Sequence, residues 1–162
     1  MKPEPTAANE FLAVHVARLS ESYTRLTGRD LRSGVVWNST GGPAAWAEAL
    51  YHAPFVLLSH DTAADPIFNY ANRTAQRLFE LNWAEITKLP SRFSAEPVSR
   101  EERARLMAEV TQRGFIDDYR GVRISSTGRR FNIERATVWN VVDERGEVTG
   151  QAATFANWTP LE

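Results

Sequence analysis

The stretch IFNYANRTAQRLFELNWAEITKLP, residues Ile67–Pro90, decides the fold. It begins with a short apolar run, IFNYA, that is typical of a strand. Asn72 follows, and its side chain can accept a hydrogen bond from the first turn of a helix through RTAQRLFEL. A second short helix, NWAEITKL, ends at Pro90. The stretch therefore predicts a strand that leads directly into two short helices.

Upstream lies the apolar run Phe55–Leu58, which predicts a strand covered on both faces. The pair His60-Asp61 follows it. A metal-dependent hydrolase would need more such ligands, and the chain has only 3 histidines. Neighbouring strand residues also point to opposite faces, so the pair cannot easily share one ion. We predict no metal site and interpret the pair as turn structure, with a pocket-lining His60 as the alternative.

Further upstream, NEFLAVHVARLSESYTRLTG predicts an amphipathic helix that stops at Gly28. We expect this helix to pack on a sheet or on a twin helix, and homodimerisation through its apolar stripe is a hypothesis. Residues 1–45 are accordingly interpreted as a helix with its linker, and residues 46–162 as the main domain. The stripe consists of Leu12, Val16, Leu19, Tyr23 and Leu26.

Downstream, SREERARLMAEVTQRG predicts a longer helix with Ser99 as its N-cap. Three segments rich in Val, Ile, Phe, Trp and Thr follow: FIDDYRGVRIS, RRFNIERATVWNVV and EVTGQAATFANW. The turn signals STG and DERG separate them, which predicts an antiparallel meander. Together these patterns predict an α+β domain with a five-stranded antiparallel sheet and short helices between strands 2 and 3.

Arg135 is placed unusually in the second of these strands. Strict alternation puts it on one apolar face with Phe131, Ile133 and Trp139. An unpaired charge there would be costly. Arg135 therefore either pairs with a carboxylate such as Asp117, lies on a solvated face, or holds an anionic group of a ligand between the sheet and the helices.

Other candidate residues are acids and aromatic side chains. Asp117 and Asp118 are interpreted as one solvated acid and one partner for an arginine, although a β-bulge could bring both to one side. Trp83 and Trp139 belong either to the core or to a pocket wall. The predicted pocket residues are His60, Trp83, Phe93, Tyr119, Phe131, Arg135, Trp139 and Phe155.

Composition narrows the possible functions. The chain has no cysteine, which excludes disulfides, thiolate zinc sites and a cysteinyl-flavin adduct. A net charge of −1 gives no electrostatic footprint for nucleic acid. No apolar run reaches the ~18 residues that a membrane span needs. We therefore expect a cytoplasmic protein whose partners are small molecules or proteins.

The order of elements resembles a PAS domain, and the opening stretch carries the resemblance. Its positions typical of that family are Asn72, Ala75, Leu78, Phe79, Glu85 and Ile86. The chain departs from the pattern at Glu80, where PAS domains commonly have glycine. More closely, the run from Trp46 to Trp158 is similar to the MEKHLA domain, a PAS-like module found as small stand-alone bacterial proteins and at the C-terminus of certain plant homeodomain-leucine-zipper proteins.

The resemblance implies a non-enzymatic sensory or regulatory module. Such a module binds a small ligand or a protein between sheet and helices and signals through its N-terminal helix. The ligand and the partner stay unknown, and haem held by His60 is unsupported. One alternative is a small cone-shaped α+β enzyme, an isomerase or cyclase that uses Asp117, Asp118, His60 or Tyr119. Another is a protein-binding domain with a filled core.

Overall fold

The computed structural model describes residues 2–95 and 97–161, with the side chains of residues 97–100 and 103 left out. The helices are η1 (Ala7–Leu12), α1 (Ala13–Thr27), η2 (Leu31–Gly34), η3 (Ser39–Gly41), α2 (Gly42–Tyr51), α3 (Arg73–Phe79), α4 (Trp83–Ile86), η4 (Ser91–Ser94) and α5 (Pro97–Arg113). The strands are β1 (Val56–His60), β2 (Phe68–Ala71), β3 (Phe115–Ile124), β4 (Arg130–Val142), β5 (Val148–Phe155) and β6 (Asn157–Leu161).

The strands form one antiparallel sheet in the order β2-β1-β5-β4-β3, and β6 pairs with the first half of β4. The predicted α+β class is confirmed, and helices α3, α4 and α5 lie between β2 and β3 in the chain. The sixth strand was not predicted. The chain bends at Ala156 and returns along β4, where Asn157 pairs with Glu134 and Leu161 with Arg130.

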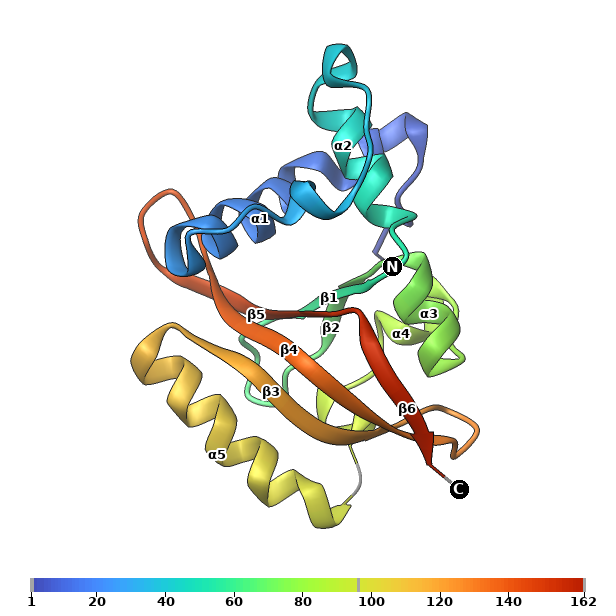
Figure 1. Ribbon diagram of the computed structural model, residues 1–162, viewed down its shortest axis with the longest axis vertical. Coiled ribbons are helices and arrows are strands. Elements are labelled where there is room, and N and C mark those ends of the chain that lie inside the picture. Colours follow the sequence, from blue (N-terminus) through green and yellow to red (C-terminus); the bar gives the residue numbers. More distant parts are fainter. Residues whose placement is uncertain (1, 96, 162) are drawn as a thin grey trace.

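Two cores lie on the two faces of the sheet (Figure 1). Helices α1 and α2 cover one face, and α5 lies across the other. The α1-side core includes Val16, Leu19 and Trp139, and the α5-side core includes Phe131 and Phe155. The sheet is therefore the middle layer of the molecule, and alternate residues of its strands point to different cores.

The predicted single apolar face of β4 is wrong, because a bulge interrupts the alternation. Arg135 on β4 and Asp118 on β3 both have φ of 53°, and the β3–β4 register shifts on either side of Tyr119. An extra residue in a strand reverses which face the following side chains occupy. Phe131 consequently faces the α5 side and Trp139 the α1 side, while Arg135 itself is exposed.

The N-terminal helix packs on its own sheet. Val16 and Leu19 are fully buried, and the indole Nε1 of Trp139 donates to the backbone oxygen of Leu19 at 3.1 Å. Leu12 precedes the helix with φ of 55°, a left-handed conformation that is costly for a leucine. Because the centre of the predicted stripe is already covered, a homodimer through it would require α1 to leave the sheet.

The stretch that predicted the fold forms the elements expected of it. The side-chain oxygen of Asn72 accepts a hydrogen bond from the backbone N–H of Ala75 at 3.1 Å, which caps α3. Its amide nitrogen donates to the backbone oxygens of Leu50 and Phe55 at 3.0 and 2.9 Å. One buried side chain thus joins β1, the end of α2 and the start of α3.

Glu80 ends α3 in the left-handed conformation, with φ of 57°. Glycine adopts this conformation without a steric cost, whereas glutamate does not. Here the hydroxyl groups of Ser125 and Thr127 both donate to its carboxylate, and the hydroxyl of Ser126 donates to its backbone oxygen at 2.7 Å. The hydrogen bonds from Ser125 and Thr127 lower the pKa of the Glu80 carboxyl group. Together with the bond from Ser126, they hold the end of α3 against the β3–β4 turn.

Candidate functional site: a cavity between the sheet and α5

A cavity of about 60 Å³ lies between the sheet and α5. Its walls come from strands β1 to β5 and from α5 and η4, together with Phe79 of α3. Most lining side chains are apolar. A water molecule needs roughly 10–15 Å³ on this measure, so the cavity has room for about four to six water molecules.

A tyrosine and an arginine on β3 give this cavity its polar corner. Arg123 is only 9% exposed, and its guanidinium donates to the hydroxyl of Tyr119 at 2.8 Å and to the backbone oxygen of Val122 at 3.0 Å. Gly121 lies between them, and a Cβ there would come within 2.9 Å of Tyr119 Cζ and 3.4 Å of Arg123 Nη1. The glycine therefore leaves the space in which these two side chains meet.

The two residues of the His60-Asp61 pair have different roles, because His60 lines the cavity and Asp61 stabilises a turn. His60 lines the cavity, and its Nδ1 lies 2.8 Å from the backbone oxygen of Asp61 and donates to it. The Asp61 carboxylate accepts from the backbone N–H groups of Ala63 and Ile67 at 3.1 and 3.0 Å. Within residues 2–95 and 97–161, no three His, Asp or Glu side chains gather as a metal site.

The other predicted pocket residues are dispersed. Tyr119 and Phe155 line the cavity, and Phe131 packs on Phe79 in the same core without reaching the cavity surface. Phe93 is 43% exposed, with the Arg92 guanidinium 4.1 Å from its ring centre.

Trp83 and Trp139 both belong to the α1-side core, behind the sheet as seen from the cavity. Arg135 is exposed at its bulge, so it cannot anchor a ligand in this cavity. Sequence reasoning missed Arg123, although its alternation with Tyr119 around a glycine was a usable signal.

The acids predicted for the enzyme alternative do not reach the cavity. Asp118 is exposed at the bulge, and Asp117 faces the α1 side, where it binds Arg29. Asp117 pairs with an arginine as expected, but this arginine is Arg29. Of the alternatives given for Arg135, the structure shows the exposed position. The cavity retains His60 and Tyr119 from that proposed set.

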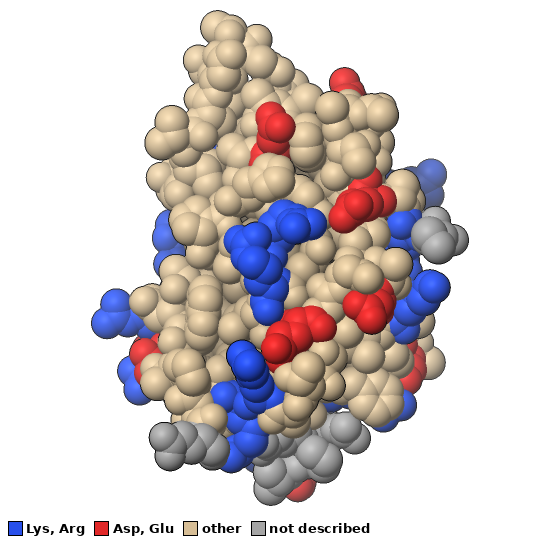
Figure 2. Space-filling model, turned by 90° about the vertical axis from the view of Figure 1, so that its right-hand side faces the viewer, with Lys and Arg blue, Asp and Glu red and all other residues tan. Residues whose placement is uncertain are grey.

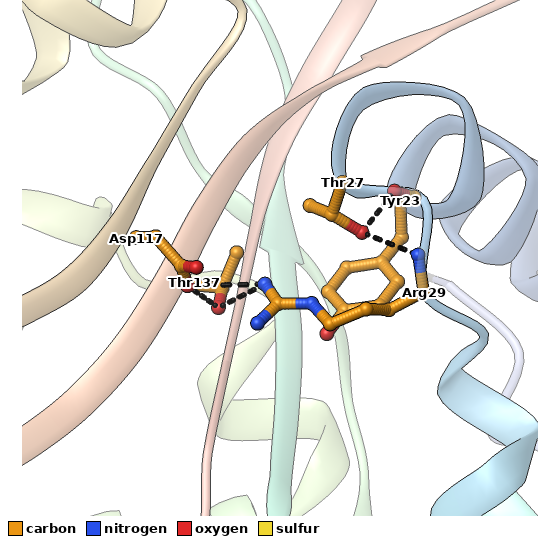
Figure 3. Close-up of polar contacts among 5 residues, drawn as sticks. All are labelled: Tyr23, Thr27, Arg29, Asp117 and Thr137. Carbon is orange, nitrogen blue, oxygen red and sulfur yellow. Dashed lines mark hydrogen bonds and ion pairs between the residues drawn. The ribbon is translucent and has the colours of Figure 1, made fainter.

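Arg29 joins the end of α1 to β3 and β4 (Figure 3). Its guanidinium lies 3.0 Å from the carboxylate of Asp117, which also accepts from the hydroxyl of Thr137 at 2.7 Å. The ring of Tyr23 lies beside the guanidinium, with the Arg29 Cζ atom 5.5 Å from the centre of the ring. Partial burial opposes ionisation of Asp117, but the hydrogen bonds from Arg29 and Thr137 outweigh it and lower the pKa of Asp117. We call these four residues the Arg29 clamp.

A second polar contact holds the other end of α1. The hydroxyl of Ser59 on β1 donates to the side-chain oxygen of Asn69 at 2.6 Å, and His15 Nε2 lies 3.1 Å from the same hydroxyl. Because that hydroxyl donates to Asn69, His15 donates to it through Nε2. Burial, together with the nearby charge of Arg18, lowers the pKa of His15 to about 4.

Cavity and helix contacts alternate along the same strands. Leu58 lines the cavity, and its neighbour Ser59 binds His15 on the other face. On β4, Val138 lines the cavity, and its neighbour Trp139 binds the backbone of α1. On both strands, a residue that lines the cavity is thus directly followed in the chain by a residue that holds α1.

This arrangement, an antiparallel sheet with a cavity under its inserted helices, defines a PAS-like domain. A PAS domain from Colwellia psychrerythraea is similar in fold, with a TM-score of 0.59 at 15% identity over 67% of this chain and 89% of that one. An RNA-binding light-oxygen-voltage receptor has a TM-score of 0.58 at 21% identity, over 72% of this chain and 33% of its own. These similarities show the fold.

The chain belongs to the MEKHLA domain family, whose family model matches residues 13–160. Its relatives include the homeobox-leucine zipper protein ATHB-9 of Arabidopsis thaliana, 28% identical over 87% of this chain. The rice homeobox-leucine zipper protein HOX29 is 26% identical over 88% of it. The chain spans only 17% and 16% of the length of these two relatives. The matched region begins at Ala13, the first residue of α1.

Two further observations concern possible partners. Among the described residues, no helix combines the length and the apolar character needed to cross a membrane. On the face shown in Figure 2, Lys and Arg side chains lie among Asp and Glu side chains and do not form one continuous basic surface.

Proposed function

We propose that this chain is a non-enzymatic sensory module that reports whether its cavity is occupied through the docking of α1. The observation that carries the proposal is the alternation of Leu58 with Ser59 and of Val138 with Trp139. The first residue of each pair contacts the cavity, and the second holds the helix. Membership of a family with a PAS-like sensory fold supports the same role.

The direction of the response follows from packing. A molecule in the cavity adds contacts to Leu58 and Val138, where the empty space provides none. Better-packed strands hold Ser59 and Trp139 more firmly in the positions that bind α1. Occupancy therefore strengthens α1 docking, and loss of the occupant favours release of the helix.

Release of α1 supplies a surface for a partner. Val16, Leu19 and Tyr23 form an apolar stripe that is covered in the docked helix. Once uncovered, this stripe suits a hydrophobic groove on a regulatory protein or the matching stripe of a second copy. The homodimer that the sequence suggests as a hypothesis would thus form from the released helix.

The experiment compares two valine substitutions on the same strand region. Ala153 lines the cavity, whereas Ala156 is exposed at the bend before β6. Ala153→Val places two more carbon atoms in the cavity without any ligand. We expect hydrogen exchange of the α1 amides to slow by about fivefold or more in Ala153→Val, and to stay at the wild-type rate in Ala156→Val.

Two results would count against the proposal. One is an unchanged α1 exchange rate in Ala153→Val while the amides of β1 and β4 slow, because the cavity would then be isolated from the helix. The other is equal slowing in both variants. Urea denaturation of each variant checks that Ala153→Val has not overpacked the core.

A further inference from the structure

Arg123 is a buried cation without an ionised partner among the described residues. The ion pairs found within residues 2–95 and 97–161 all involve other arginines. The guanidinium binds only a phenol and a backbone carbonyl, both uncharged. A buried charge is normally paired, because removing it from water is costly. Arg123 therefore presents a charge to the cavity that no described side chain neutralises.

The neighbouring hydroxyl extends the same site. The Tyr119 hydroxyl accepts a hydrogen bond from Arg123 and has its own proton to donate. A guanidinium carries five N–H donors in a planar fork, and here two of its nitrogens have the partners described above. Both residues line the cavity, and their remaining N–H and O–H donors are of the kind that binds the two oxygens of a carboxylate.

The other walls of the cavity indicate the size and the chemical character of the rest of the ligand. Phe79, Leu106 and Val110 contribute apolar walls opposite the sheet. Room for about four to six water molecules, each with a share of liquid volume of about 30 Å³, fits a short acyl chain or one aromatic ring together with a carboxylate, because covalently bonded atoms lie closer together than separate waters. A large cofactor exceeds this space. The polar corner and the apolar walls together describe a small monocarboxylic acid.

We propose that the cavity binds a small aliphatic or aromatic monocarboxylic acid, with its carboxylate on Arg123 and Tyr119 and its apolar end towards α5. This inference rests on the proposed sensory function and names the class of molecule that is sensed. It also moves the anion-binding role that the sequence suggested for Arg135 to Arg123, which is the arginine at the cavity.

The test compares an acid with its uncharged amide. Hexanoate carries a five-carbon tail that matches the cavity, and hexanamide has the same shape without the charge. Calorimetric titration of the wild-type protein should show hexanoate binding at least about tenfold more tightly than hexanamide, as expected for hydrogen bonds to a charged group.

Variants locate the charge that produces this preference. Arg123→Gln should remove the difference between hexanoate and hexanamide. Arg120→Gln is the matched control, because Arg120 is exposed on the same strand, and it should keep the preference. Tyr119→Phe retains the ring and loses the donor, so its preference should fall between these two.

Three outcomes would overturn the inference: equal binding of acid and amide to the wild-type protein, no binding of either, or a preference retained in Arg123→Gln. The comparison in the wild-type protein needs no variant to fold. The exchange experiment with Ala153→Val uses no acid, so the ligand class and the sensory mechanism can fail separately.

Discussion

His15 should make the stability of the protein depend on pH in a way that a substitution can remove. It lies between α1 and the sheet, and burial, helped by Arg18, lowers the pKa of His15 from 6.5 to about 4. Each pKa unit corresponds to about 1.4 kcal/mol. The difference of about 2.5 units therefore corresponds to about 3 kcal/mol of unfolding free energy.

The sign of the effect follows from proton uptake. In the unfolded chain His15 takes up a proton near pH 6.5, whereas in the folded protein it stays neutral until about pH 4. Between these values the unfolded state binds more protons, so the free energy of unfolding decreases as the pH is lowered. The contribution is complete above pH 6.5 and is lost by pH 4.

The assay is urea denaturation at several pH values between 7.5 and 4. In His15→Gln the free energy of unfolding should fall by about 3 kcal/mol less across this range than in the wild-type protein. Val14→Ala is the control, because Val14 is exposed on the same helix and carries no titratable group, and the pH dependence of this variant should match that of the wild-type protein. If His15→Gln and the wild-type protein lose stability in parallel, His15 is not the buried neutral group described here.

Three further substitutions test the layers around the sheet. Leu19→Ala removes a fully buried side chain of α1 and should cost about 2–5 kcal/mol in urea denaturation; a cost below 1 kcal/mol would show that α1 is not packed as described. Arg29→Ala breaks a half-exposed ion pair and should cost less than about 1 kcal/mol while speeding exchange at the C-terminal end of α1; unchanged exchange would deny the Arg29 clamp a role in docking. Gly121→Ala places a methyl group against the Tyr119 ring and should lower thermal stability more than Ala153→Val does; equal melting temperatures would contradict the close approach.

The order of the helices and strands could be predicted because most of these elements have a signal in their own local sequence. Asn72 caps α3 through its own side chain, and the turns STG and DERG separate the long strands. The apolar runs of β1 and β2 were recognisable without any knowledge of their partners. Fold class therefore followed from patterns within a few residues of one another.

The composition of the site could not be predicted in the same way. The bulge uses positive φ at Asp118, which tolerates that conformation, and at Arg135, which has no preference for it. It reverses the faces of the second half of β4. Alternation then assigned Arg135 to the apolar face and left Arg123 unnoticed. The sixth strand was missed for a related reason, since Ala156 is an inconspicuous position for a bend.

The link between the two faces of the sheet is tested most directly by its reciprocal effect on binding. If occupancy strengthens α1 docking, weakening the docked helix must weaken binding in the cavity by the same factor. Hexanoate should therefore bind Leu19→Ala at least about fivefold more weakly than Val14→Ala, whose altered side chain lies on the exposed face of the same helix at 75% exposure. Equal affinities in these two variants, with both folded, would mean that the cavity and α1 are independent.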